Sequence, residues 1–128
     1  MVENRARRVL IADDETLITM LIQDMLSDLG FETVGPAHQL TEALSLAEES
    51  AFDCAILDLN MNGRSTTPVA EILLARGVPF AFASGYAVSD LGPAFEDVPV
   101  LQKPFDATDL AEILDQLLGF RADAAADN

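Results

Sequence analysis

The chain has 128 residues, and 22 acidic side chains against 7 basic ones give it a formal charge of −15. Half of its residues are hydrophobic and fall in regular runs, which argues against disorder and supplies one core but not two. So negative a charge disfavours nucleic acid and anionic membranes as partners, and we expect neither.

The polar first residues lead into an apolar run at residues 9–12, which is too short for the core of a secretion signal. No apolar run approaches the length that spans a membrane. Cys54 is the only cysteine, so the chain cannot form an internal disulfide. These features predict a cytoplasmic protein.

Short apolar runs alternate with longer amphipathic stretches along the chain. The runs predict buried strands at residues 9–12, 31–34, 54–57, 80–83 and 100–101. The stretches predict helices at residues 17–29, 40–49, 68–76 and 106–117. This alternation predicts a single-domain (βα)5 α/β fold, which is a doubly wound, five-stranded parallel sheet with helices on both faces.

Several residues mark the ends of these elements. Gly30 is expected to end the first helix, and Gly35 with Pro36 to close the second strand. Pro68 suits the first turn of the third helix, and Asp106 is expected to cap the last one.

Two segments lack a clear pattern. Residues 59–66 are expected to form a polar loop. A fourth helix is expected between the last two strands, but that segment is interrupted by Gly85, Gly92, Pro93 and Pro99. We therefore predict that the fourth helix is short or mobile. The domain is expected to span residues 7–119, between a lead-in at residues 1–6 and a flexible tail at residues 120–128.

Polar side chains directly follow four of the five predicted strands. They are Asp13, Asp14, Asp58, Ser84 and Lys103, the last being the only lysine. The carboxyl ends of parallel strands share one edge, where open α/β sheets bind their ligands, so we expect these side chains to meet. A single aspartate at such a position is more often a helix cap, but the joint placement favours a functional site.

Three neighbouring carboxylates repel one another and call for a hard cation such as Mg²⁺. A partly exposed carboxylate beside that cation could attack a phosphoryl group and form an aspartyl phosphate. Lys103 would neutralise the phosphoryl oxygens, and the Ser84 hydroxyl would donate a hydrogen bond to one of them.

The motifs at these positions resemble those of bacterial response-regulator receiver domains of the CheY-like type. They are Asp13-Asp14-Glu15, Leu57-Asp58-Leu59-Asn60-Met61, Ala83-Ser84-Gly85 and Lys103-Pro104-Phe105. The similarity covers residues 7–119 and implies the flavodoxin-like strand order 2-1-3-4-5.

The resemblance implies that Asp58 is the phosphoacceptor and receives its phosphoryl group from a histidine kinase or a phosphotransferase. It implies Mg²⁺ as the cofactor, with Asp14, Asp58 and the backbone carbonyl of Asn60 as ligands. Asp13 would contribute directly or through water.

By the same resemblance, Ser84 takes the place of the family's switch Ser/Thr, and Lys103 that of its phosphate-binding lysine. The peptide bond between Lys103 and Pro104 is expected to be cis, a form essentially restricted to proline. Residues 79–86 read Pro-Phe-Ala-Phe-Ala-Ser-Gly-Tyr and resemble the PFxFATGY subfamily. Members are often stand-alone receivers paired with HWE-type kinases, so such a partner is implied.

The chain departs from the usual receiver pattern at two positions. Val100 stands where the switch aromatic is common, and Asn62 replaces a common proline. We therefore predict that phosphorylation orders or moves residues 86–95, with Tyr86 as the reporter, instead of flipping a ring at position 100.

The favoured function is a stand-alone response regulator of a two-component phosphorelay. It would signal through an unknown downstream protein or act as a phosphate sink, and it would not be an enzyme beyond catalysing its own phosphorylation and dephosphorylation. One alternative is a small phosphatase resembling the haloacid-dehalogenase group, although Asn60 cannot serve as the general acid that such chemistry needs two residues after the nucleophile. Another is a binding module that works without phosphorylation. This alternative remains because Val100 stands in place of the usual switch aromatic.

Three further residues are interpreted as structural. His38 is expected to be a solvated loop residue, because no second type of metal ligand clusters with it. Cys54 is interpreted as a small buried hydrophobe, and Phe105 as core packing behind Lys103.

Overall fold

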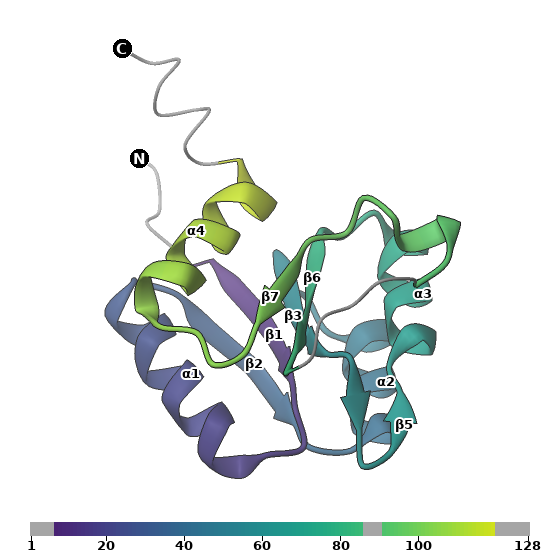
Figure 1. The fold of residues 1–128 in the computed structure, drawn as a ribbon, viewed down its shortest axis with the longest axis horizontal. Coiled ribbons are helices and arrows are strands. Elements are labelled where there is room, and N and C mark those ends of the chain that lie inside the picture. Colours follow the sequence, from purple (N-terminus) through teal and green to yellow (C-terminus); the bar gives the residue numbers. More distant parts are fainter. Residues whose placement is uncertain (1–6, 86–90, 120–128) are drawn as a thin grey trace.

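The computed structural model describes residues 7–85 and 91–119, which form a parallel sheet between two layers of helices (Figure 1). The five strands of the sheet are β1 (Arg8–Ala12), β2 (Glu32–Ala37), β3 (Cys54–Asp58), β6 (Phe80–Ser84) and β7 (Val100–Gln102). They lie in the order β2-β1-β3-β6-β7, and every pairing is parallel. This order is the predicted order 2-1-3-4-5, so the doubly wound α/β fold is confirmed.

The helices are α1 (Thr16–Asp28), α2 (Leu40–Glu49), α3 (Thr67–Arg76) and α4 (Ala107–Leu118). Helices α1 and α4 cover one face of the sheet, and α2 and α3 cover the other (Figure 1). The first face buries Ile22 and Leu26 of α1 and Leu110 and Leu114 of α4 in one hydrophobic cluster with side chains of the sheet. Among the described residues, no helix is long and apolar enough to cross a membrane.

Most of the predicted end signals are confirmed. The turn after α1 contains Gly30 at φ +90°, and Pro68 lies in the first turn of α3. The Asp106 side chain accepts a hydrogen bond from the Asp109 amide at 2.9 Å, which completes a capping box at the start of α4. These signals are reliable because each supplies a backbone angle or an acceptor that a helix end requires.

The expected end of the second strand is wrong. Strand β2 continues through Gly35 and Pro36, and Ala37 pairs with Ala12 after an irregularity in the register. Because β2 lies at the edge of the sheet, its proline is tolerated where a central strand would lose a ladder hydrogen bond.

The expectation of a plain loop at residues 59–66 is also wrong. The short strands β4 (Asn60–Met61) and β5 (Arg64–Ser65) form an antiparallel hairpin there. Its two-residue turn consists of Asn62 at φ +54° and Gly63 at φ +81°. Positive φ at both central residues is what a type I′ hairpin turn requires, and Asn-Gly is its most favoured sequence.

The segment between β6 and β7 contains one 3-10 helix, η1 (Pro93–Phe95), within its described residues 91–99. Residues 86–90, which include Tyr86, lie outside the described residues. The segment of the predicted fourth helix is therefore described only from residue 91 onward. Phe95 is buried and packs edge to face on Phe82, with ring centroids 5.7 Å apart. This contact anchors the segment to strand β6.

Candidate functional site

Three carboxylates gather at the carboxyl ends of β1 and β3. Asp13 and Asp14 follow β1, and Asp58 is the last residue of β3. The register pairs Ala12 with Leu57, so Asp13 and Asp58 are neighbours across the two strands. A carboxylate oxygen from each of the three aspartates lies within 4.8 Å of the others. The predicted cluster is therefore present, with Asp13 and Asp58 buried and Asp14 half-buried.

Lys103 reaches this cluster from the end of the edge strand β7. Its Nζ lies 2.9 Å from Oδ2 of Asp13 and 3.4 Å from Oδ2 of Asp58, and the exposed Glu15 is also 3.4 Å away. The backbone N–H of Lys103 donates to the Ser84 carbonyl at 2.8 Å, which fixes the residue at the end of β7. The Lys103–Pro104 peptide is cis, as expected.

Burial and neighbouring charges shift the pKa values of Asp58 and Lys103. Burial, together with the neighbouring Asp13 charge, raises the pKa of Asp58 from 3.8 to about 6, although Lys103 opposes the shift. Burial alone would lower the pKa of Lys103, but its hydrogen bonds to Asp13 and Asp58 and their charges outweigh burial and raise that pKa. At neutral pH the site therefore holds an ionised Asp58 beside an ammonium group.

Asn60 and Ser84 lie at the same edge as the aspartates. The Asn60 N–H donates a long hydrogen bond of 3.4 Å to Oδ1 of Asp58. Ser84 is buried at the end of β6, directly after Ala83, which pairs with Asp58. The predicted metal-binding and phosphate-binding residues thus belong to one edge of the sheet.

Val100 lies apart from the cluster, at the start of β7. It pairs with Phe82 across the sheet and leaves 38% of its surface exposed. Phe105 is half-buried and packs against the core under α1 and α4, as interpreted from the sequence.

Thr66 is a site residue that the sequence did not indicate. Its hydroxyl donates to the Asp58 carbonyl at 2.7 Å and approaches the Leu59 carbonyl at 3.2 Å, and the side chain is fully buried. Thr66 therefore fixes the backbone on which the Asp58 carboxylate stands. No local pattern announces a bond between residues eight positions apart in an irregular segment.

Asn62 is a second residue whose contacts the sequence did not indicate. Its backbone N–H donates to Oδ2 of Asp14 at 2.7 Å, and its side-chain Nδ2 donates to the His38 carbonyl at 3.2 Å. His38 is half-buried and lies 3.2 Å from the Thr19 hydroxyl through Nε2, so it is not a free loop residue. The Asn-Gly dipeptide was the available signal, because it is typical of a tight hairpin.

The residues at this edge fit a magnesium ion. Carboxylate oxygens are the ligands that Mg²⁺ prefers, and three of them converge from two adjacent strands. Asp13 and Asp14 with Asp58 would hold the ion, and Lys103 is close enough to neutralise a group bound beside it.

A comparison with protein families identifies the family to which a chain with this site belongs. The family model of the response regulator receiver domain matches residues 9–115. The chain is a receiver domain. The match spans β1 to α4 and includes all the aspartates and the lysine described above.

Curated relatives of this receiver domain are regulatory proteins. The transcriptional regulatory protein PdtaR of Mycobacterium tuberculosis is 39% identical over 108 residues, which are 81% of this chain and 53% of that protein. The phyllosphere-induced regulator PhyR of Methylorubrum extorquens is 31% identical over 123 residues, which are 93% of this chain and 46% of that protein. The chain spans about half the length of these relatives.

Solved structures show the same fold. The solution structure of SdrG from Sphingomonas melonis Fr1 matches with a TM-score of 0.77 and 42% identity, covering 88% of this chain and 97% of that one. The crystal structure of PhyR from Brucella abortus matches with a TM-score of 0.78 and 28% identity, covering 96% of this chain and 52% of that one. The receiver domain therefore has a response-regulator role.

Proposed function

We propose that this receiver domain accepts a phosphoryl group on Asp58 from a phosphohistidine of a histidine kinase or a phosphotransferase. The observation that carries the proposal is the meeting of Asp58 with Asp13 and Lys103, which come from three different strands. A nucleophilic carboxylate, its acidic neighbours and a cation for the phosphoryl oxygens are the parts that this transfer needs.

In the proposed transfer, an oxygen of the ionised Asp58 attacks phosphorus and forms the new P–O bond. The P–N bond of the phosphohistidine breaks, and its electron pair returns to the imidazole ring. Mg²⁺ bound by the aspartates would neutralise negative charge on the phosphoryl oxygens. Lys103, whose Nζ lies 3.4 Å from Oδ2 of Asp58, and the Ser84 hydroxyl would each hold one of these oxygens.

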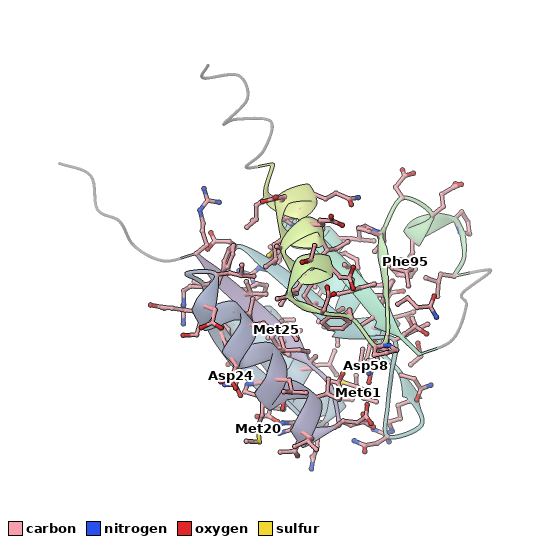
Figure 2. The ribbon with its side chains drawn as sticks, turned by 60° about the vertical axis from the view of Figure 1, so that its left-hand side comes forward. Met20, Asp24, Met25, Asp58, Met61 and Phe95 are labelled. Carbon is pink, nitrogen blue, oxygen red and sulfur yellow. The ribbon has the colours of Figure 1, made fainter. Side chains whose placement is uncertain are left out.

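The surface beside the site suits a protein donor. Leu17, Met20 and Leu21 of α1 are exposed by 70%, 55% and 52%. Figure 2 shows Met20 on the outer side of α1 and Asp58 at the end of the sheet. A groove of about 430 Å³ is lined by residues of α1, by Phe105 and by Lys103. A donor that covers this apolar face would present its phosphohistidine to Asp58.

Finer parts of the proposal rest on the resemblance in residues 79–86. They are membership of the PFxFATGY subfamily and an HWE-type kinase as donor. A cytoplasmic location is proposed separately, from the short apolar runs and the single cysteine. The output would be a contact with a downstream protein or the draining of phosphate from the kinase. The domain would catalyse only its own phosphorylation and dephosphorylation.

The test uses phosphoramidate, a small donor with a P–N bond, together with Mg²⁺, and reads the intact mass. We expect one added phosphoryl group in the wild type and none in Asp58→Ala, while Asp53→Ala, which alters an aspartate just before β3, should still be modified. No adduct in the wild type with phosphoramidate or with a kinase would overturn the proposal. Steady release of inorganic phosphate from a small phosphate ester would favour a phosphatase instead.

A further inference from the structure

The hairpin turn at Asn62 and Gly63 contacts the aspartate cluster through Asp14. The Asn62 N–H donates to Oδ2 of Asp14 at 2.7 Å, the length of a strong charge-assisted hydrogen bond. The two residues are 48 positions apart in the sequence, so the hairpin between β3 and α3 reaches across to the loop after β1.

Asp14 differs from the other two aspartates in its partners. In the described part of the chain, the carboxylates that pair with Lys103 belong to Asp13, Glu15 and Asp58, and Asp14 is not among them. Asp14 is also the least buried of the three clustered aspartates. Its orientation therefore depends on the hairpin and not on the lysine.

The direction in which the Asn62 N–H points is set by the backbone angles of the turn. Asn62 at φ +54° and Gly63 at φ +81° adopt left-handed angles that asparagine and glycine tolerate and proline cannot. The Asn62 side chain holds the turn from the other side through its bond to the His38 carbonyl. A proline at this position would lose both the angle and the donor.

We propose that Asn62 is a positioning residue, which holds Asp14 ready for the cation through its backbone N–H. The bond uses one lone pair of Oδ2 of Asp14, so the carboxylate keeps lone pairs to ligate the ion. The half-buried carboxylate thereby stays within 4.8 Å of its neighbours before the ion arrives. This inference rests on the proposed function, because it assigns the aspartate cluster to Mg²⁺.

Two glycines make a matched pair for the test. Gly63 at φ +81° and Gly30 at φ +90° both have open space where a Cβ would point, so the Cβ of valine meets no neighbour at either position and the backbone angle carries the strain. Gly63 lies in the hairpin beside Asp14, whereas Gly30 lies before β2, at the opposite end of the sheet. Gly63→Val should therefore disturb the cation site, and Gly30→Val should cost similar stability without affecting it.

The experiment measures the Mg²⁺ dissociation constant of the unphosphorylated protein by titration calorimetry. We expect about a tenfold increase in Gly63→Val and in Asn62→Pro, the usual size of the effect when a residue that orients a metal ligand is lost. Gly30→Val should bind Mg²⁺ as the wild type does. Asn62→Gly keeps the N–H but loses the side-chain bond, so its dissociation constant should rise less than that of Asn62→Pro.

The possible outcomes separate this inference from the function on which it rests. A wild type that binds no Mg²⁺ overturns both. A wild type that binds Mg²⁺, with Gly63→Val and Gly30→Val equally affected or equally unaffected, overturns the positioning role alone. If Asn62→Pro does not fold, as judged by circular dichroism, Gly63→Val still decides the question.

Discussion

The Nζ atom of Lys103 lies closer to Asp13, at 2.9 Å, than to Asp58, at 3.4 Å. The lysine is therefore anchored by an aspartate other than the proposed phosphoacceptor. Modification of Asp58 would leave that anchor in place, so the ammonium group would remain at the site to meet a phosphoryl oxygen. Its side chain is only 16% exposed, so water screens its attraction to Asp13 less than in a surface ion pair, and loss of the lysine would leave buried carboxylates unpaired.

Removal of this lysine should make the protein depend on Mg²⁺ for stability. We expect Lys103→Ala to lower the free energy of unfolding by about 2 to 3 kcal/mol in metal-free buffer, because two buried carboxylates lose their counter-charge. Mg²⁺ should then raise the thermal midpoint more than it does in the wild type, since the ion no longer competes with an ammonium group. Thermal unfolding with EDTA and with saturating Mg²⁺ measures both effects.

Arg8→Ala is the control for the loss of a positive charge. Arg8 lies at the start of β1, and its ion pair with Glu32 is exposed and 3.7 Å long. Mg²⁺ should stabilise this variant as much as it stabilises the wild type. An equal gain from Mg²⁺ in Lys103→Ala and Arg8→Ala would contradict the prediction.

The raised pKa of Asp58 predicts a pH dependence of stability. The folded state holds a proton on Asp58 up to about pH 6, whereas the unfolded chain releases it near pH 3.8. Between these values the folded state binds more protons, so the free energy of unfolding should fall as the pH rises. The full cost above pH 6 is about 2 kcal/mol once solvent screening of the carboxylate is allowed for.

Asp58→Asn removes this cost, because the amide carries no charge. Its free energy of unfolding in metal-free buffer should exceed that of the wild type at pH 7 and approach it near pH 4. Urea denaturation across this range measures the difference. A constant difference between pH 4 and pH 7 would show that Asp58 does not titrate in that range.

The sequence predicted the sheet and most of the site for one physical reason. Strands buried on both faces appear as continuous apolar runs, and the residue after such a run must lie at the carboxyl edge of a parallel sheet. The apolar pattern alone therefore places Asp13 and Asp58 together. It is weaker before Lys103, because β7 is an edge strand that buries only Leu101. The cis peptide before Pro104 followed from the family motif and not from the apolar pattern.

The features that the sequence did not predict depend on contacts between residues far apart in the chain, or on which face of a helix packs against the sheet. The hydroxyl of Thr66 and the N–H of Asn62 act on partners that no local spacing identifies. The apolar spacing on α1 predicted the helix, but Leu17 and Leu21 point to solvent because the sheet covers only the side that holds Ile22. Pro36 suggested a strand end because proline cannot donate a hydrogen bond to a neighbouring strand. An edge strand tolerates this loss, and the sequence does not show that β2 lies at the edge.

Thr66 should contribute to stability through its hydroxyl. Thr66→Val keeps the shape of the side chain but leaves the Asp58 carbonyl without its donor, in a position with no access to water. We expect a loss of about 1 to 3 kcal/mol in the free energy of unfolding, measured by urea denaturation. Thr67→Val is the neighbouring control, since the Thr67 hydroxyl accepts a hydrogen bond from the exposed Ser65, and its loss should stay below about 0.5 kcal/mol. Equal losses in the two variants would contradict the role of Thr66.

The conformational response to phosphorylation is predicted to pass through Phe82 and Phe95. Ser84 ends the strand that carries Phe82, and Phe82 packs edge to face on Phe95 of η1, which Figure 2 shows on the far side of Asp58 from α1. A phosphoryl group held by Ser84 would pull on the end of β6 and change this ring contact. Val100 pairs with the same Phe82 but has no ring to reorient.

Beryllofluoride, a mimic of the phosphoryl group, tests this response by NMR. We expect the amide signals of residues 91–95 and the ring signals of Phe95 to shift when the mimic and Mg²⁺ are added, and Tyr86 should report the same change, although it lies outside the described residues. The matched control is Asp58→Asn, in which the mimic has no carboxylate to bind and the signals should stay fixed. Shifts confined to the amides around Val100, with residues 86–95 unchanged in the wild type, would mean that the output lies on β7, and the predicted response would be wrong.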